Sequence, residues 1–196
     1  LNLAMKVLDL KKNDEVITPC LNFGTAVSSI ALISAKPIFV DVDLETLQIN
    51  TKNILKKINK KTKAVLIPNL LGNIPDWEEI YKICKKKKIK IIEDSADTLG
   101  AKIKNKTTGA FSDISITSFY GSHVISCAGN GGMFLTNNKK YYDRAKVIRS
   151  WGRMSTLLKD SENIKNRLGI KLMGIDFDRK FVFSEIGYNF EPSEIS

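Results

Sequence analysis

Short apolar runs alternate with amphipathic segments along the chain of 196 residues. Runs rich in Ile, Val and Leu predict buried strands, and segments whose apolar residues recur every three or four positions predict helices. The expected strands are residues 15–18, 37–42, 64–68, 89–93, 114–118 and 132–136. The expected helices are residues 2–10, 25–34, 52–58, 76–86 and 139–149. This alternation is typical of an α/β domain with a mostly parallel sheet and flanking helices.

Residues 154–171 break this pattern, because they are polar and follow no strict period. We expect a long surface excursion there, before the more apolar segment FVFSEIGYNF at residues 181–190. In an enzyme such an excursion often covers an active site. The chain contains no internal repeat or low-complexity linker, and its length suffices for one domain with a sizeable core.

The charge balance is basic, with 31 Lys and Arg against 21 Asp and Glu and a formal net charge of +10. Such a charge can indicate a nucleic-acid or membrane partner. The lysines instead form short clusters near the ends of expected helices, where cations favour the helix dipole and remain solvated. These clusters are Lys56-Lys57, Lys60-Lys61 and residues 85–88. We therefore expect neither nucleic acid nor membrane as a partner, and only mild attraction of small anionic ligands.

The three cysteines, Cys20, Cys84 and Cys127, are odd in number and lack metal-ligand spacing. Neither a disulfide scaffold nor a metal site is expected, and a reducing cytoplasm is the expected location. No apolar run approaches the ~20 residues that a membrane helix needs. No secretory signal peptide is recognisable.

The most informative segment is SFYGSHVISCAGNGGMFLTN, residues 118–137, which contains the only histidine, His123. It resembles the cofactor segment of the DegT/DnrJ/EryC1/StrS sugar aminotransferase family, roughly Ser-Phe-x-x-x-Lys-x-x-x-x-x-Gly-x-Gly-Gly. Ser118, Gly129, Gly131 and Gly132 match without a gap, and His123 stands at the lysine. An isolated histidine is more often a structural residue, but these flanks favour a functional one.

The exchange of lysine for His123 changes the expected chemistry. In the family the lysine forms a Schiff base with pyridoxal phosphate, whereas an imidazole forms no stable imine but can move protons near neutral pH. The same exchange marks the family's sugar 3-dehydratases, which hold pyridoxamine phosphate without a covalent bond. The resemblance therefore implies that His123 is a catalytic base.

A second motif, IKIIEDSADTLGA at residues 89–101, ends an expected strand with acidic residues. Ligands of open α/β sheets bind at that end of the strands. By resemblance, Asp94 pairs with the cofactor's pyridine nitrogen and keeps it protonated. Asp97 stands where the aminotransferases usually have glutamine, and an acidic residue there resembles the dehydratases. The alternative is that Glu93, Asp94 and Asp97 cap a following helix.

Two further cofactor contacts are implied by the resemblance. Phe23, in the loop after the first expected strand, matches the aromatic residue that stacks on the cofactor ring, although a core aromatic at a helix start would look the same. Ser118 matches the serine that binds the cofactor phosphate.

Two motifs near the chain's end also resemble the family. Gly187-Tyr188-Asn189 matches a Gly-x-Asn motif whose asparagine reaches the cofactor of the neighbouring subunit, which implies a homodimer with a shared active site. Arg149 and Arg153 match residues that approach the sugar nucleotide, and arginine suits a diphosphate because it donates two parallel hydrogen bonds. A turn in the first case and a surface helix end in the second remain alternatives.

One dehydratase subclass is disfavoured by residue type. Its members have iron–sulfur cysteines in the acidic motif and after the Trp-Gly-Arg motif. This chain has Ser95 and Ala96 in the first place and residues 154–156, Met-Ser-Thr, in the second. Thiolates are the usual cluster ligands, so we expect no iron–sulfur cluster. The resemblance is closest to GDP-4-keto-6-deoxymannose 3-dehydratases, which regenerate pyridoxamine phosphate with L-glutamate.

Together these features predict a fold-type-I, aspartate aminotransferase-like enzyme that depends on pyridoxal or pyridoxamine phosphate. We expect it to remove the C3 hydroxyl of a nucleotide-linked 4-keto-6-deoxy sugar in deoxysugar biosynthesis, as in lipopolysaccharide O-antigen. Residues 1–196 are expected to form the cofactor-binding large domain of a longer enzyme, with chain missing at the N-terminus and most of a small domain missing at the C-terminus. Two alternatives are an inactive or regulatory aminotransferase homologue without its lysine and a basic binding module without catalysis.

Overall fold

The computed structural model describes residues 1–196 and contains two compact units. The first comprises Leu1–Asn137 with Ile195–Ser196, and the second comprises Asn138–Glu194. The first unit contains α1 (Asn2–Val7), β1 (Glu15–Pro19), α2 (Gly24–Leu32), β2 (Lys36–Val40), α3 (Thr51–Lys57), β3 (Thr62–Pro68), the 3₁₀ helix η1 (Leu70–Gly72), α4 (Trp77–Lys87), β4 (Lys90–Asp94), β5 (Lys102–Ile103), β6 (Lys106–Thr107), β7 (Ile114–Ser118) and β8 (Gly132–Leu135).

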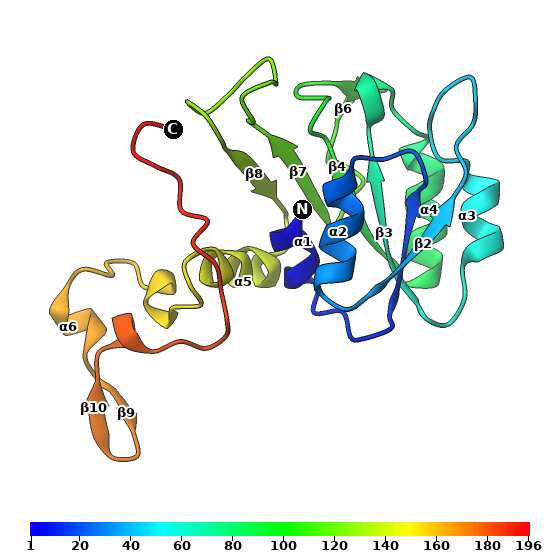
Figure 1. The fold of residues 1–196 in the computed structure, drawn as a ribbon. Coiled ribbons are helices and arrows are strands. Elements are labelled where there is room, and N and C mark those ends of the chain that lie inside the picture. The colour runs from blue at the N-terminus through cyan, green and yellow to red at the C-terminus, as the bar shows by residue number, and fades with distance from the viewer. The chain divides into compact units, whose positions relative to one another are not determined.

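A six-stranded sheet in the order β2-β1-β3-β4-β7-β8 forms the centre of the first unit (Figure 1). All neighbouring strands are parallel except β8, which runs antiparallel to β7. The predicted mostly parallel sheet is therefore confirmed. Because the strands are parallel, β1, β3, β4 and β7 end on the same side of the sheet, which we call the carboxyl edge.

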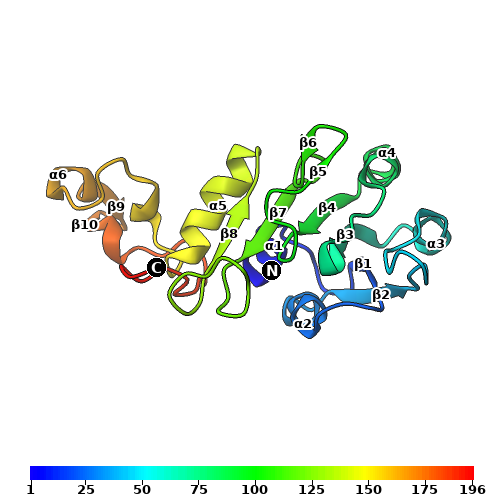
Figure 2. The ribbon, with the colours of Figure 1, turned by 90° about the horizontal axis from the view of Figure 1, so that it is seen from above.

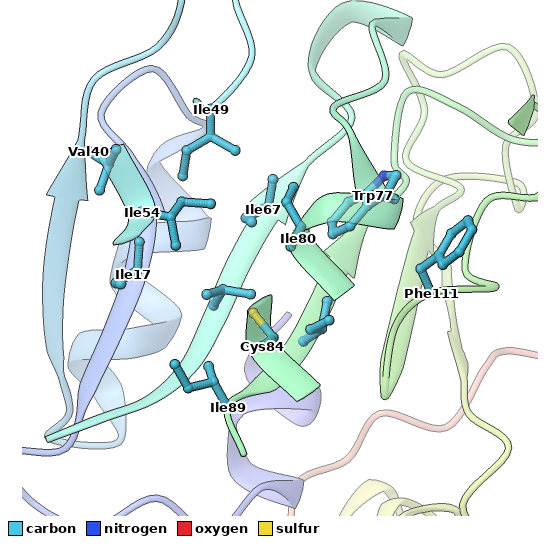
Figure 3. Close-up of a cluster of buried hydrophobic side chains, with 12 residues drawn as sticks. Ile17, Val40, Ile49, Ile54, Ile67, Trp77, Ile80, Cys84, Ile89 and Phe111 are labelled. Atoms are coloured by element: carbon cyan, nitrogen blue, oxygen red, sulfur yellow. The ribbon is translucent and has the colours of Figure 1, made fainter. Parts of the chain in front are cut away.

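Helices cover both faces of this sheet, with α1 and α2 on one face and α3 and α4 on the other (Figure 2). The apolar side of α4 packs on the strands through Trp77, Ile80 and Cys84, all fully buried (Figure 3). Burial raises the pKa of the Cys84 thiol to about 12, with a further contribution from Asp113. Cys84 is therefore an apolar core residue rather than a reactive thiol.

The ends of the helices explain most of the lysine clusters. The Asp76 carboxylate accepts a hydrogen bond from the Glu79 N–H at the start of α4, and Lys85, Lys86 and Lys87 occupy its last turn. α3 likewise ends with two lysines. Helix α1 ends at Val7, earlier than predicted, because Asp9 adopts a left-handed conformation with φ of 54°.

The second unit contains α5 (Lys139–Arg149), the 3₁₀ helix η2 (Met154–Leu157), α6 (Ile164–Arg167), β9 (Ile170–Leu172), β10 (Ile175–Phe177) and the 3₁₀ helix η3 (Arg179–Phe181). β9 and β10 form an antiparallel hairpin. The expected excursion thus contains a short helix and a hairpin strand that its polar sequence did not predict. No helix of either unit is both long enough and apolar enough to cross a membrane.

Candidate active site

The end of β4 brings two carboxylates to the carboxyl edge. Glu93 is fully buried and Asp94 is 7% exposed. The Asp94 Oδ1 accepts a hydrogen bond from the Ala96 N–H at 3.1 Å. Burial raises the pKa of Asp94, and this hydrogen bond opposes the shift. Residues 95–100 form turns rather than a helix, so these acidic residues do not cap a following helix.

Glu93 is held by a network of buried donors. Its Oε1 accepts hydrogen bonds from the Asn69 Nδ2 and the Ser95 hydroxyl, both at 2.9 Å, and its Oε2 accepts the Gly109 N–H at 2.8 Å. Asn69 follows β3 and accepts the indole N–H of Trp77 at 2.8 Å. The sequence pattern did not indicate a role for Asn69 or Trp77. The only available signal was a polar residue directly after a buried strand.

His123 lies in the β7–β8 loop at residues 119–131 and is half-buried. Its Nδ1 is 3.8 Å from the Asp97 Oδ1, and Tyr120 packs edge-on against the imidazole with ring centroids 6.4 Å apart. The other Asp97 oxygen accepts the Leu71 N–H at 3.2 Å. The structure therefore brings together the two residues that the sequence associated with dehydratases.

The loop that carries His123 folds back on itself. The Phe119 N–H donates to the Gly131 carbonyl at 2.9 Å, and the Cys127 N–H donates to the Phe119 carbonyl at 3.1 Å. A Cβ added to Gly131 would lie only 2.6 Å from the Cys127 Cβ. The loop therefore requires glycine at this position of the motif.

Phe23 and Ser118 also lie at the carboxyl edge. Phe23 immediately precedes α2 and is 70% exposed, so it is not the core aromatic of the alternative interpretation. Ser118 ends β7, and its Oγ accepts the Tyr120 N–H at 3.2 Å while its hydroxyl hydrogen remains available to another acceptor. The first unit therefore supplies an exposed aromatic ring, a buried carboxylate, a hydroxyl and an imidazole along one sheet edge.

The other motif residues lie in the second unit. Residues 187–190 run beside the end of α5, where the Tyr188 N–H donates to the Ile148 carbonyl at 2.7 Å and Ser150 pairs with Asn189. A Cβ on Gly187 would lie 2.2 Å from the Gly152 nitrogen, so this approach requires glycine. The Gly-x-Asn and Trp-Gly-Arg motifs are thus neighbours, and Asn189 is exposed.

The two candidate substrate arginines have different surroundings. Arg149 forms an ion pair with Glu191 at 3.0 Å, whereas the Arg153 guanidinium stacks over Trp151 at 4.4 Å from the ring centre. The Nε atoms of both arginines are buried without a hydrogen-bond partner. Glu191 therefore neutralises part of the positive charge with which Arg149 would bind a diphosphate. No group of three or more His, Cys, Asp or Glu side chains could hold a metal ion.

Comparison with known proteins identifies the family. Residues 1–196 match the DegT/DnrJ/EryC1/StrS aminotransferase family, so the chain belongs to this family, and the predicted family and fold class are confirmed. The chain is 36% identical over 195 residues to the GDP-perosamine synthase of Escherichia coli O157:H7, covering 100% of this chain and 47% of the relative. It is 33% identical to the GDP-4-keto-6-deoxy-D-mannose 3-dehydratase of Escherichia coli O55:H7, covering 95% of this chain and 47% of that protein.

Solved structures show the same fold. The Escherichia coli GDP-4-keto-6-deoxy-D-mannose-3-dehydratase with bound hydrated PLP matches with a TM-score of 0.85 and 32% identity, over 99% of this chain and 50% of that chain. A mutant of GDP-4-keto-6-deoxymannose-3-dehydratase with bound GDP-perosamine matches with a TM-score of 0.85 and 31% identity, over 99% and 50% of the two chains. The chain spans about half the length of these relatives.

Proposed function

We propose that the full-length protein is a pyridoxamine phosphate-dependent 3-dehydratase of a nucleotide-linked 4-keto-6-deoxy sugar, with L-glutamate as amino donor. The observation that carries this proposal is His123, which replaces the family's lysine and has Asp97 3.8 Å from its Nδ1. A carboxylate beside one imidazole nitrogen orients the ring and leaves the other nitrogen to move a proton. The similarity to a 3-dehydratase in sequence and fold supports the same conclusion.

The residues at the carboxyl edge fit a pyridine cofactor. The Asp94 Oδ2 makes no hydrogen bond within the chain and can accept one from the ring nitrogen, while Phe23 offers an exposed ring for stacking. Ser118 can donate its hydroxyl to the phosphate. When bound, pyridoxamine phosphate supplies the amine that condenses with the sugar ketone and a ring that accepts electrons.

The chain's own residues then have separate tasks. With the cofactor bound, His123 would serve as the base for the proton on the cofactor's C4′ carbon, and Asp97 would stabilise the protonated imidazole. Asp94 keeps the ring nitrogen protonated. The C3 hydroxyl would leave the sugar as water. In the second unit, Arg153 and Arg149 are the residues proposed to bind a nucleotide diphosphate, and Glu191 partly neutralises Arg149.

Transamination is the second candidate reaction, because the chain is 36% identical to a GDP-perosamine synthase. The two reactions have different products. Dehydration removes the C3 oxygen and leaves a C4 ketone, whereas transamination keeps that oxygen and adds nitrogen at C4. A transaminase without the lysine also lacks the residue that usually serves as its proton carrier.

The test is to incubate the full-length protein with pyridoxamine phosphate, L-glutamate and GDP-4-keto-6-deoxymannose and to measure the product by mass spectrometry. We expect a GDP sugar without the C3 oxygen. A GDP-linked 4-amino sugar would support transamination, and recovery of unchanged substrate with bound cofactor would support the inactive homologue. His123→Lys is the companion variant, which should allow covalent cofactor attachment that borohydride makes permanent.

We also propose a homodimer in which Asn189 serves the partner's cofactor. Mixing an Asn189→Ala subunit with a His123→Asn subunit should then restore part of the activity, because one composite site in each heterodimer is intact. Heterodimers that form but remain inactive would count against a shared site.

A further inference from the structure

The buried Glu93 is the most unusual charged group of the first unit. It is 0% exposed, and its three hydrogen-bond donors, Asn69, Ser95 and Gly109, are all neutral. A buried carboxylate without a cation is costly unless donors satisfy both of its oxygens. The position of Glu93, directly before Asp94, therefore suggests a role for this buried carboxylate at the candidate site.

The direction of each hydrogen bond in the network is determined by its chemistry. The indole N–H of Trp77 can only donate, and it donates to the Asn69 Oδ1 at 2.8 Å. The Asn69 amide nitrogen must therefore face the Glu93 Oε1, the Ser95 Oγ and the Thr98 Oγ1, at 2.9, 3.0 and 3.1 Å. The Gly109 N–H is backbone and can only donate to the Glu93 Oε2.

This network lies on both sides of the candidate site carboxylates. Asp94 is between Glu93 and Ser95, and its carbonyl accepts the Asn69 N–H at 2.9 Å. Asp97 directly precedes Thr98. The network therefore holds the residues on both sides of Asp94 and the residue directly after Asp97.

We propose that Glu93 is a positioning residue, whose buried carboxylate anchors the turn at residues 95–100 and so fixes Asp94 toward the cofactor ring. This inference rests on the proposed function for its cofactor, but the anchoring of the turn does not. The critical property of Glu93 is that both oxygens accept. Glutamine has the same shape but carries an NH₂ group on one side, which would face either the Gly109 N–H or the Asn69 amide, both donors.

The test compares Glu93→Gln with Glu15→Gln in the full-length protein. Glu15 is a matched control because it is also buried, at 8% exposed, and accepts a hydrogen bond from an asparagine, the Asn59 Nδ2 at 2.6 Å. Glu15 is the first residue of β1, so it lies at the side of the sheet opposite the carboxyl edge. We expect Glu93→Gln to raise the dissociation constant of pyridoxamine phosphate by ~10-fold or more, and Glu15→Gln to change it by less than ~2-fold.

A double mutant separates positioning from general destabilisation. If Glu93 acts through Asp94, Glu93→Gln should add less than ~2-fold to the dissociation constant in an Asp94→Asn background. The proposal would be overturned if Glu93→Gln weakened pyridoxamine phosphate binding as much in the Asp94→Asn background as in wild type. It would also be overturned if Glu15→Gln weakened binding as much as Glu93→Gln.

Amide hydrogen exchange in the cofactor-free protein tests the anchor without any ligand. Residues 95–100 should exchange ~10-fold or more faster in Glu93→Gln than in wild type, and at the wild-type rate in Glu15→Gln. Unchanged exchange in Glu93→Gln would overturn the anchoring. If the wild type binds no pyridoxamine phosphate, the proposed function fails, while the exchange result still decides whether Glu93 anchors the turn.

Discussion

The end of β4 and the β7–β8 loop both carry candidate catalytic groups at the carboxyl edge, but the structure holds them in opposite ways. Glu93, beside Asp94, is 0% exposed and accepts three hydrogen bonds. His123 lies in a loop whose next residue, Val124, is fully exposed, and its side chain lies against Asp97 and Tyr120.

This difference matches what each group would do. A carboxylate that pairs with a cofactor ring must stay in one place, and a buried, fully satisfied network provides that. A group that moves protons must reach its substrate, and loops supported by a rigid scaffold commonly carry such groups. Substitutions at the end of β4 should therefore change stability, whereas substitutions in the loop should change the reaction.

The largest effect is expected for His123→Asn in the full-length protein. Dehydration should fall by ~10²- to 10⁴-fold, the usual contribution of a positioned base, while pyridoxamine phosphate still binds through Phe23, Asp94 and Ser118. Single-turnover kinetics and a cofactor titration measure the two quantities separately. Wild-type rates in this variant would return His123 to a structural role.

The next effect concerns stability. Trp77→Phe removes the indole N–H and leaves the buried Asn69 Oδ1 without its donor, so the free energy of unfolding should fall by about 1–3 kcal/mol. Denaturant titration measures it, with Val124→Ser in the exposed loop as the comparison, expected within about 0.5 kcal/mol of wild type. If Trp77→Phe and Val124→Ser lowered the free energy of unfolding equally, the two regions would not differ in their contribution to stability.

A smaller effect is expected where the two regions meet. Asp97→Asn keeps an acceptor for the Leu71 N–H but removes the charge beside His123, so the turnover number should fall by about 3- to 10-fold. The Michaelis constant and the stability should stay close to wild type, because Asp97 is exposed. A change in the Michaelis constant alone would instead make Asp97 a substrate contact.

Much of this architecture could be predicted from the sequence. The strand Thr62–Pro68 contains the apolar run AVLIP, and the helix Lys139–Arg149 begins directly after a capping asparagine, Asn138. The hairpins formed by β5 with β6 and by β9 with β10 were not predicted. Their strands have two or three residues each, which is too short to establish a period of two.

The sequence indicated the candidate site residues one by one but not their geometry. The motif around His123 indicated the chemistry, and the 3.8 Å approach of Asp97 came only with the fold. Asn69 was missed because its role depends on Trp77 and Glu93, eight and 24 positions away. The ion pair between Glu191 and Arg149 could not be predicted either, because it depends on how the chain returns to α5.

The smallest effect is expected for Asp94, which belongs to both regions because it is buried like the network and faces the site. Burial raises its folded-state pKa above the unfolded value. Such a carboxyl group contributes its full stability below the unfolded pKa and loses it as the pH rises through the folded pKa. Asp94→Asn does not titrate, so at neutral pH the cofactor-free variant should be more stable than wild type.

Thermal unfolding from about pH 8 to about pH 4 tests this sign, because the advantage of Asp94→Asn should shrink as the pH approaches the ordinary carboxyl value of about 3.9. Asp160→Asn, at an exposed position, should show no such trend. With pyridoxamine phosphate bound, wild type should instead be more stable than Asp94→Asn. Only wild type can pair a carboxylate with the ring nitrogen and gain the full stabilisation from the ligand. If Asp94→Asn and wild type had the same thermal stability at every pH, with and without cofactor, burial would not destabilise the Asp94 carboxylate. Asp94 would then not pair with the ring nitrogen of the cofactor.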